Sequence, residues 1–149
     1  MNFVTYGDYA ARARASFARQ PAMETMGITV SDVAPGRVWL TMPFNEALTQ
    51  QHGFLHAGVV TSALDTAAGF AAYTLMPEDA GVLTVELKTS LMAPAKGQRF
   101  NFEARVLKPG RTIIFTEAVA HAIDDGRERE IVRLTATMMV VQGRDDVKG

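Results

Sequence analysis

The segment from Ala57 to Leu75 constrains the fold more than any other part of this sequence. It is long, apolar and rich in small residues, and Asp65 is its only side chain that is charged at neutral pH. The apolar run Val59–Met76 nearly reaches membrane-spanning length, but a charge near its centre is costly in lipid. We therefore expect a helix of a soluble protein that other elements cover on most sides.

Four segments after this helix alternate apolar and polar residues with the period of two that strands require. They are Val82–Met92, Arg99–Lys108, Arg111–Ile123 and Glu130–Val141. Two shorter strands, Ile28–Val33 and Val38–Met42, precede the helix and are joined by the turn "APGR". Because short turns connect these strands, we expect an antiparallel sheet.

The remaining segments predict little further regular structure. Thr5–Arg19 has the spacing of an amphipathic helix, which Pro21 ends. Asn45–Leu55 is interpreted as a polar, irregular connection, and the charged residues 142–149 as a frayed tail. We interpret residues 1–149 as one α+β domain with an N-terminal helical extension over residues 1–24, in which a curved sheet wraps around the long helix.

Charge and composition exclude several classes of function. A formal net charge of −1 gives no reason to expect nucleic acid or an anionic membrane as a partner. The absence of Cys excludes disulfides, thiolate zinc sites and cysteine nucleophiles, and it fits a reducing compartment. The first twenty residues lack the continuous apolar stretch of a signal peptide. We expect a cytoplasmic protein.

Asp65 calls for an explanation, because an ionised carboxylate in an apolar setting is costly unless it is paired or hydrogen-bonded. Thr61 and Ser62 lie one turn earlier and could donate hydrogen bonds, which would make Asp65 a structural residue. Carboxylates in such settings also cluster at active sites. The residues alone leave both interpretations open.

The stretch "HGFLHAG", from His52 to Gly58, adds a second feature. A glycine-containing turn that leads into a helix presents free backbone N–H groups, as an oxyanion hole requires. A carboxylate further along the same helix could activate water. We expect no metal site, since His121 is the only His besides His52 and His56. Walker, G-x-G-x-x-G and G-x-S-x-G motifs are absent.

The segment Gln50–Tyr73 resembles the signature of hotdog-fold acyl-CoA thioesterases, and most closely that of the PaaI-like, phenylacetate-degradation branch. That signature is an Asn or Gln, then G-x-x-H-G-G, then a helix with a catalytic Asp. The matching residues here are Gly53, His56, Ala57, Gly58 and Asp65. The similarity extends over roughly Asp32 to Val141.

The resemblance implies roles for several residues. Asp65 would act on the thioester as a general base or nucleophile, and the Ala57 N–H would polarise the thioester carbonyl. Gly58 would allow close approach at the helix start, and Thr84 would orient the water. Ala57 departs from the usual Gly, so an N–H donor remains but fewer backbone angles are accessible.

Substrate contacts are implied in the same way. Either Gln50 or Gln51 would replace an Asn that holds the carbonyl or the water. Lys108 and Arg111 would contact CoA phosphate, unless they are simply solvated charges of a hairpin. The apolar residues expected to line the acyl site are Phe54, Leu55, Phe70 and Tyr73.

The family also implies a curved antiparallel sheet around one helix and a homodimer whose sheets join edge to edge, often doubled to a tetramer. Active sites would lie at the dimer interface, with acyl-CoA as substrate and no cofactor. A hydratase would need motifs that we do not find, and a sensor would need a DNA-binding module for which the N-terminus is too short. A non-catalytic carrier of acyl-CoA or another apolar ligand remains the main alternative, and it predicts that Asp65 is dispensable.

Overall fold

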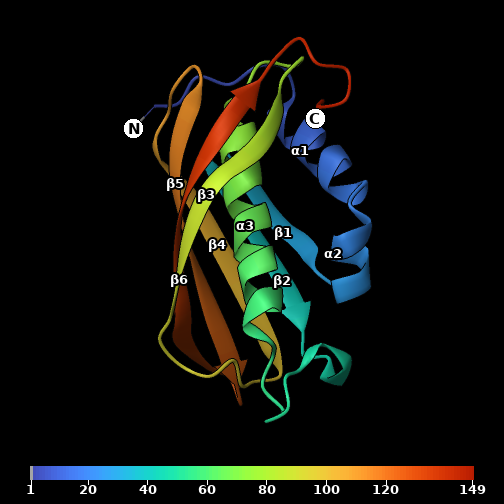
Figure 1. The fold of residues 1–149 in the computed structure, drawn as a ribbon, viewed down its shortest axis with the longest axis vertical. Coiled ribbons are helices and arrows are strands. Elements are labelled where there is room, and N and C mark those ends of the chain that lie inside the picture. The colour runs from blue at the N-terminus through green and yellow to red at the C-terminus, as the bar shows by residue number, and fades with distance from the viewer. Residues whose placement is uncertain (1) are drawn as a thin grey trace.

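One long helix lies across a six-stranded sheet in the computed structural model, which describes residues 2–149 (Figure 1). The helix, α3, spans Ala57–Tyr73. The strands are β1 (Thr29–Ala34), β2 (Arg37–Pro43), β3 (Gly81–Leu91), β4 (Arg99–Lys108), β5 (Ile113–Asp124) and β6 (Arg127–Val141). They follow the order β1-β2-β4-β5-β6-β3, and every neighbouring pair is antiparallel. The predicted α+β arrangement is confirmed.

The N-terminal region differs from the prediction. A single helix over Thr5–Arg19 was expected, but α1 spans only Tyr9–Ala18 and begins after Asp8, whose carboxylate accepts the Ala11 N–H at 3.0 Å. A second helix, α2, follows over Pro21–Met26. Proline needs no N–H donor in the first turn of a helix, so Pro21 starts this helix as well as ending the previous one.

Two further boundaries are corrected. The connection Asn45–Leu55 contains a short 3-10 helix, η1, at Glu46–Leu48. Helix α3 ends at Tyr73 rather than Leu75. In the charged residues 142–149, the Gly149 N–H donates to the Ala80 carbonyl at 3.2 Å.

Small residues let α3 lie close to the concave face of the sheet. The fully buried alanines of this helix are Ala63, Ala67, Ala68, Ala71 and Ala72. They face large core side chains of the sheet, including Leu40, Phe100, Phe102, Leu134 and Met138. Burial of this apolar surface provides the main stabilisation of the domain.

Helix α1 covers another side of α3. The Phe17 ring packs edge-on against Phe70, with centroids 5.8 Å apart, and Phe70 contacts Tyr73 in the same way at 5.9 Å. Arg12 lies over the Tyr73 ring and donates to the Met76 carbonyl at 3.0 Å. The N-terminal extension is therefore packed onto the C-terminal half of α3.

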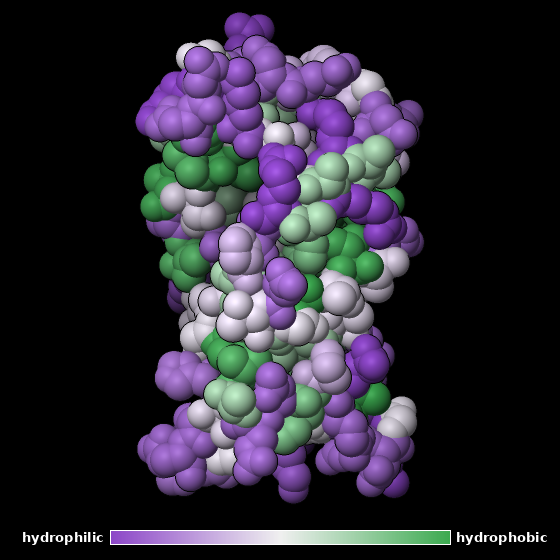
Figure 2. All heavy atoms as spheres, turned by 90° about the vertical axis from the view of Figure 1, so that its right-hand side faces the viewer, coloured by the Kyte–Doolittle hydropathy of each residue, from purple (hydrophilic) through white to green (hydrophobic). Residues whose placement is uncertain are grey.

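Strand β3 is an edge strand with unusual exposure. Within residues 2–149 it pairs only with β6, and its other edge faces outward. Its exposed apolar side chains, with those of the residue that follows, are Leu83, Val85, Leu87, Leu91 and Met92. Figure 2, which views the side of α1 and α2, also shows hydrophobic residues at the surface between two hydrophilic ends. A single chain thus leaves apolar surface uncovered.

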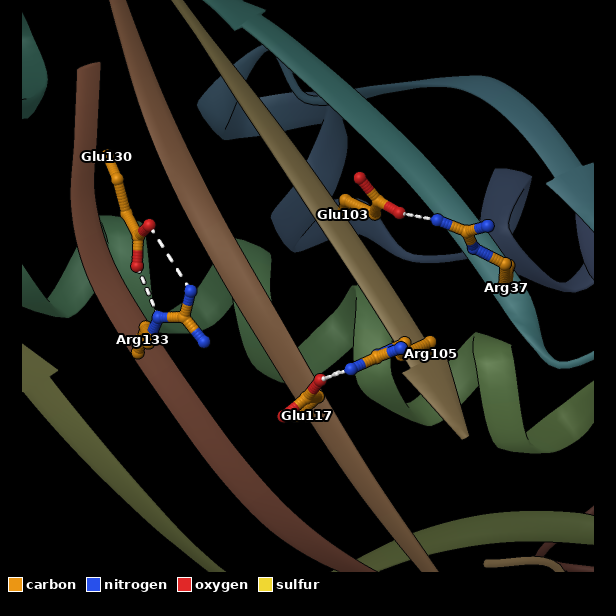
Figure 3. A network of polar contacts seen from close by, with 6 residues as sticks. All are labelled: Arg37, Glu103, Arg105, Glu117, Glu130 and Arg133. Atoms are coloured by element: carbon orange, nitrogen blue, oxygen red, sulfur yellow. Dashed lines mark hydrogen bonds and ion pairs between the residues drawn. The ribbon is translucent and has the colours of Figure 1, made fainter. Parts of the chain in front are cut away.

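The face of the sheet opposite α3 carries ion pairs (Figure 3). These pairs are Arg37–Glu103, Arg105–Glu117 and Arg133–Glu130. The hydrogen bond from Arg133 lowers the pKa of Glu130 below its ordinary value. Because all three pairs are solvated, we assign them little of the stability of the domain. In the part of the chain that the structure describes, no helix is long and apolar enough to cross a membrane.

Candidate functional site

A cavity of about 500 Å³ lies beside the N-terminal end of α3, at the lower end of the helix in Figure 1. Four segments form it: the connection before α3, the first turn of α3, residues 91–95 at and after the end of β3, and Val132 of β6. Its lining is apolar except for Gln50, Gln51 and His56. The apolar lining includes Phe54, Leu55, Val60, Leu91, Met92 and Val132. Such a site can hold an apolar group at one end and a polar group at the other.

The first turn of α3 leaves one backbone donor free at this cavity. His56 is the N-cap residue, and its Nδ1 accepts the Gly58 N–H at 2.8 Å. The N–H groups of Val59 and Val60 donate to the His56 carbonyl. Among residues 2–149 the Ala57 N–H has no acceptor. An unpaired N–H at a helix N-terminus favours a developing negative charge.

The glycine at position 58 makes room for this cap. A Cβ there would lie 3.0 Å from His56 Nδ1, which is too close for an unstrained contact. Gly58 is therefore explained by the approach of His56, in addition to the close approach of substrate that the resemblance implied.

Gln50 is better placed than Gln51 to act at this site. The Gln50 N–H donates to the Phe54 carbonyl at 2.8 Å, and its side-chain Oε1 accepts the His52 N–H. Because Oε1 is occupied, the two Nε2 hydrogens of the Gln50 side chain remain as free donors. Gln51 is exposed, and the sequence had not distinguished the two.

Asp65 has a hydrogen-bond partner from the sheet, not from its own helix. Thr84 of β3 donates its hydroxyl to Asp65 Oδ1 at 2.8 Å. Ser62 donates instead to the Gly58 carbonyl, and the Thr61 hydroxyl lies 3.5 Å from that of Thr89. Neither Thr61 nor Ser62 therefore donates the hydrogen bond to Asp65 that the sequence had suggested. Asp65 is half-buried, so its second oxygen remains open to a ligand or water.

A β-bulge brings Thr84 to this position. The register between β3 and β6 shifts between Thr84 and Glu86, so Val85 is the additional residue. The bulge places Val85 at the surface with 53% of its area exposed, while Thr84 faces α3. Bulges that aim a side chain in this way are common next to active sites.

Ala57 and Asp65 do not meet within one chain. They are eight residues apart on one helix, which separates them by about 12 Å along its axis. Asp65, Gly58 and Thr84 are also not part of the lining of the cavity at Ala57. One chain therefore holds two separate groups of candidate residues, which we call the donor half-site, at the unpaired Ala57 N–H, and the carboxylate half-site, at Asp65 and Thr84.

Comparison with known proteins identifies the family. A family model described as "Thioesterase superfamily" matches residues 52–129, which is just over half of the chain. The chain belongs to the thioesterase superfamily. A solved structure of a thioesterase family protein from Silicibacter pomeroyi is 55% identical, with a TM-score of 0.90, and covers 91% of this chain and 99% of its own.

Two further proteins are similar to the chain, one in sequence and one in fold. Human acyl-coenzyme A thioesterase 13 is 34% identical over 90 residues, which are 60% of this chain and 64% of the human protein. The Escherichia coli PaaI structure has a TM-score of 0.78 at 15% identity, and covers 89% of this chain and 93% of its own. That likeness shows the fold alone. The predicted hotdog fold is confirmed, and the PaaI-like branch stays a prediction.

The predicted substrate residues of this superfamily member fall into three places. Phe54 and Leu55 line the cavity at Ala57. Phe70 and Tyr73 do not: they are only 5% and 2% exposed, and they pack against α1. An acyl-binding role for these two would need a rearrangement of α1.

Lys108 and Arg111 lie at the other end of the molecule, near the turn between β4 and β5 (Figure 1). Both are exposed. Arg111 lines a second cavity of about 470 Å³ together with Leu75, Met76 and Pro77, beyond the C-terminal end of α3. The distance from their own chain's Ala57 leaves a CoA contact for these residues as a prediction.

The end of β3 and the residues that follow it are the part of the cavity that sequence reasoning missed. Leu91, Met92 and the residues up to Ala95 form one wall of the cavity, and the Leu55 N–H donates to the Ala95 carbonyl at 3.1 Å. From the sequence, Val82–Met92 had been interpreted only as a strand, and the residues after it had been assigned no role. Among residues 2–149, no group of three or more His, Cys, Asp or Glu side chains could hold a metal ion.

Proposed function

We propose that this chain hydrolyses an acyl-CoA thioester to a free acid and CoA. The observation that carries the proposal is the unpaired Ala57 N–H at an apolar cavity, together with the hydrogen-bonded pair Asp65–Thr84. The name of the human relative supports acyl-CoA as the substrate. The order of the motif residues supports the PaaI-like branch.

We further propose that the active enzyme is a homodimer with shared sites. The two half-sites are too far apart in one chain to act on one carbonyl carbon. Strand β3 offers an open edge with exposed apolar side chains, and Val85 is 53% exposed. A twofold contact along β3 would place two α3 helices side by side in opposite directions, so that Asp65 of one chain faces the first turn of the other.

The reaction then needs few groups. Asp65 accepts a proton from water while Thr84 holds its other oxygen, and the water oxygen bonds to the thioester carbon. The carbonyl oxygen becomes negative and accepts hydrogen bonds from the Ala57 N–H and the Gln50 amide. The C–S bond then breaks, its electron pair stays on the CoA sulfur, and the acid is released.

Two variants test this assignment with little change to the fold. Asp65→Asn removes the base but keeps a similar shape. Ala57→Pro replaces the amide hydrogen with the Cδ of the proline ring, so it removes the donor, and proline is accepted at the first position of a helix. His56 has φ −59° and ψ 136°, which is the conformation that proline requires of the residue before it.

We expect Asp65→Asn to abolish release of CoA and Ala57→Pro to lower kcat by roughly 10²–10³-fold. Release of the thiol is followed with a thiol-trapping reagent on a panel of acyl-CoAs, and melting temperatures confirm folding. Ala57→Gly, which keeps the N–H, is the matched control and stays active. If the wild type binds acyl-CoAs but cleaves none of them, the carrier interpretation replaces this proposal.

A further inference from the structure

The N-cap of α3 fixes the protonation of His56. Gly58 can only donate through its backbone N–H, and it does so to His56 Nδ1 at 2.8 Å. Nδ1 must therefore be unprotonated. A neutral imidazole carries its single proton on the other nitrogen when one nitrogen accepts. The cap thus selects the tautomer of His56 with the proton on Nε2.

This tautomer presents a second hydrogen-bond donor to the cavity. His56 lines the same cavity as Ala57, and its side chain is exposed. The described part of the chain provides no acceptor for His56 Nε2. The Gly58 N–H holds the His56 ring through Nδ1, and the Nε2–H has no partner. The Nε2–H is therefore available to donate to a substrate in the cavity.

The donors at the cavity can be matched to the groups of a thioester. If the proposed function holds, the carbonyl oxygen accepts from the Ala57 N–H and the free Nε2 hydrogens of Gln50. The leaving sulfur also gains negative charge, and it is bonded to the same carbon. His56 is the polar lining side chain directly next to Ala57 in the chain, whereas Gln51, which also lines the cavity, lies six residues before Ala57.

We propose that His56 donates a hydrogen bond from Nε2 to the CoA sulfur as the C–S bond breaks. The electron pair of that bond stays on sulfur, which leaves as a thiolate. His56 keeps its proton, so no imidazolate forms, and the proton that Asp65 took from water passes to the thiolate or to solvent. Neutral histidines at helix N-termini are suited to this electrophilic role.

Variants separate this role from the cap itself. Asparagine is among the best N-cap residues and can accept the Gly58 N–H, but its shorter side chain ends before the position of Nε2. His56→Asn therefore keeps the helix start and removes the donor, whereas His56→Ala removes both. We expect His56→Asn to melt close to the wild type and His56→Ala to melt lower.

The decisive measurement compares two leaving groups on one acyl chain in single-turnover experiments. One substrate is the acyl-CoA, and the other is the thioester of a nitrothiophenol, whose acidic thiol leaves without help. We expect His56→Asn to slow cleavage of the acyl-CoA by roughly 10²-fold and cleavage of the aryl thioester only slightly. Equal slowing of both substrates, or no slowing of either, overturns the proposal.

Ala57→Pro is the control for this comparison, because a donor to the carbonyl oxygen is needed whatever the leaving group. It should slow both substrates alike. If Ala57→Pro and Asp65→Asn leave the rates unchanged, the proposed function itself fails. If those variants are slow and only His56→Asn is unaffected, the role of His56 alone fails.

The tautomer can be observed without activity. Nitrogen-15 NMR of the labelled protein distinguishes the two neutral tautomers, and His56→Asn identifies which signals belong to this residue. We expect the tautomer with the proton on Nε2. A proton on Nδ1 would contradict the inference, since Gly58 would then lose its acceptor.

Discussion

The hydroxyl of Thr84 is the partner that makes a carboxylate acceptable in the middle of an apolar helix. It holds Asp65 Oδ1 at 2.8 Å, and the β3 bulge at Val85 aims it there. One oxygen of Asp65 is therefore fixed and the other is left for water. A hydrogen bond to the ionised form also stabilises the charge where burial would otherwise be costly.

Thr84→Val tests whether this contact serves the reaction. Valine keeps the shape of the side chain but cannot donate, so Asp65 loses its orientation, and we expect kcat to fall by roughly 10- to 10²-fold. Thr84→Ser restores the hydroxyl and should recover most of the rate. Steady-state kinetics on one acyl-CoA measure both variants. An unchanged kcat for Thr84→Val would mean that the contact is only structural.

At the level of elements, α1 and α3 form one packed unit. The rings of Phe17, Phe70 and Tyr73 contact in sequence, and Arg12 joins the unit to the carbonyl of Met76. This unit belongs to the core and not to the cavity at Ala57. The two ends of α3 therefore have different surroundings: its first turn lies at the cavity and its last turns lie in the core.

We expect Phe70→Ala to cost about 3–5 kcal/mol of unfolding free energy, because it removes a buried ring. It should leave KM for acyl-CoA nearly unchanged. Phe54→Ala is the matched control: Phe54 lines the cavity and is half-exposed, so KM should rise while stability changes less. Denaturant titration and steady-state kinetics measure the two quantities. A raised KM for a stable Phe70→Ala would return Phe70 to the acyl site.

The periodic pattern of the sequence predicted the strands and α3 to within a few residues, because their burial alternates or repeats regularly. It failed where one residue both ends one helix and starts the next. Pro21 ends α1 and also starts α2, and the sequence pattern showed only the first. The pattern also could not show that Phe54 lines the cavity while Phe70 lies in the core. Both are aromatic residues in or just before α3, and only their packing distinguishes the two places.

For the whole molecule, the main consequence is that the groups we propose as catalytic are divided between two places. Local sequence placed Ala57 and Asp65 on one helix, and helix geometry then keeps them about 12 Å apart. The resemblance predicted a shared site, while composition and spacing alone could not, because a contact between chains leaves no local pattern. The open apolar edge of β3 is the structural feature that favours such a contact.

Complementation between two inactive chains tests the division directly. We expect heterodimers of Asp65→Asn with Ala57→Pro, co-expressed with two different tags and purified through both, to regain about half of the wild-type activity. One of their two sites would combine Asp65 from one chain with the Ala57 N–H from the other. The second site would carry both changes and stay inactive.

A second heterodimer, in which both substitutions are on the same chain, makes the test conclusive. It pairs a wild-type chain with a chain that carries both substitutions, so it contains the same mutations in a different arrangement. If each site is shared, both of its sites hold one defect and it is inactive; if each chain acts alone, it keeps about half of the activity. The two arrangements predict opposite results for the same pair of proteins, so assays of both purified heterodimers decide whether catalysis crosses the β3 edge.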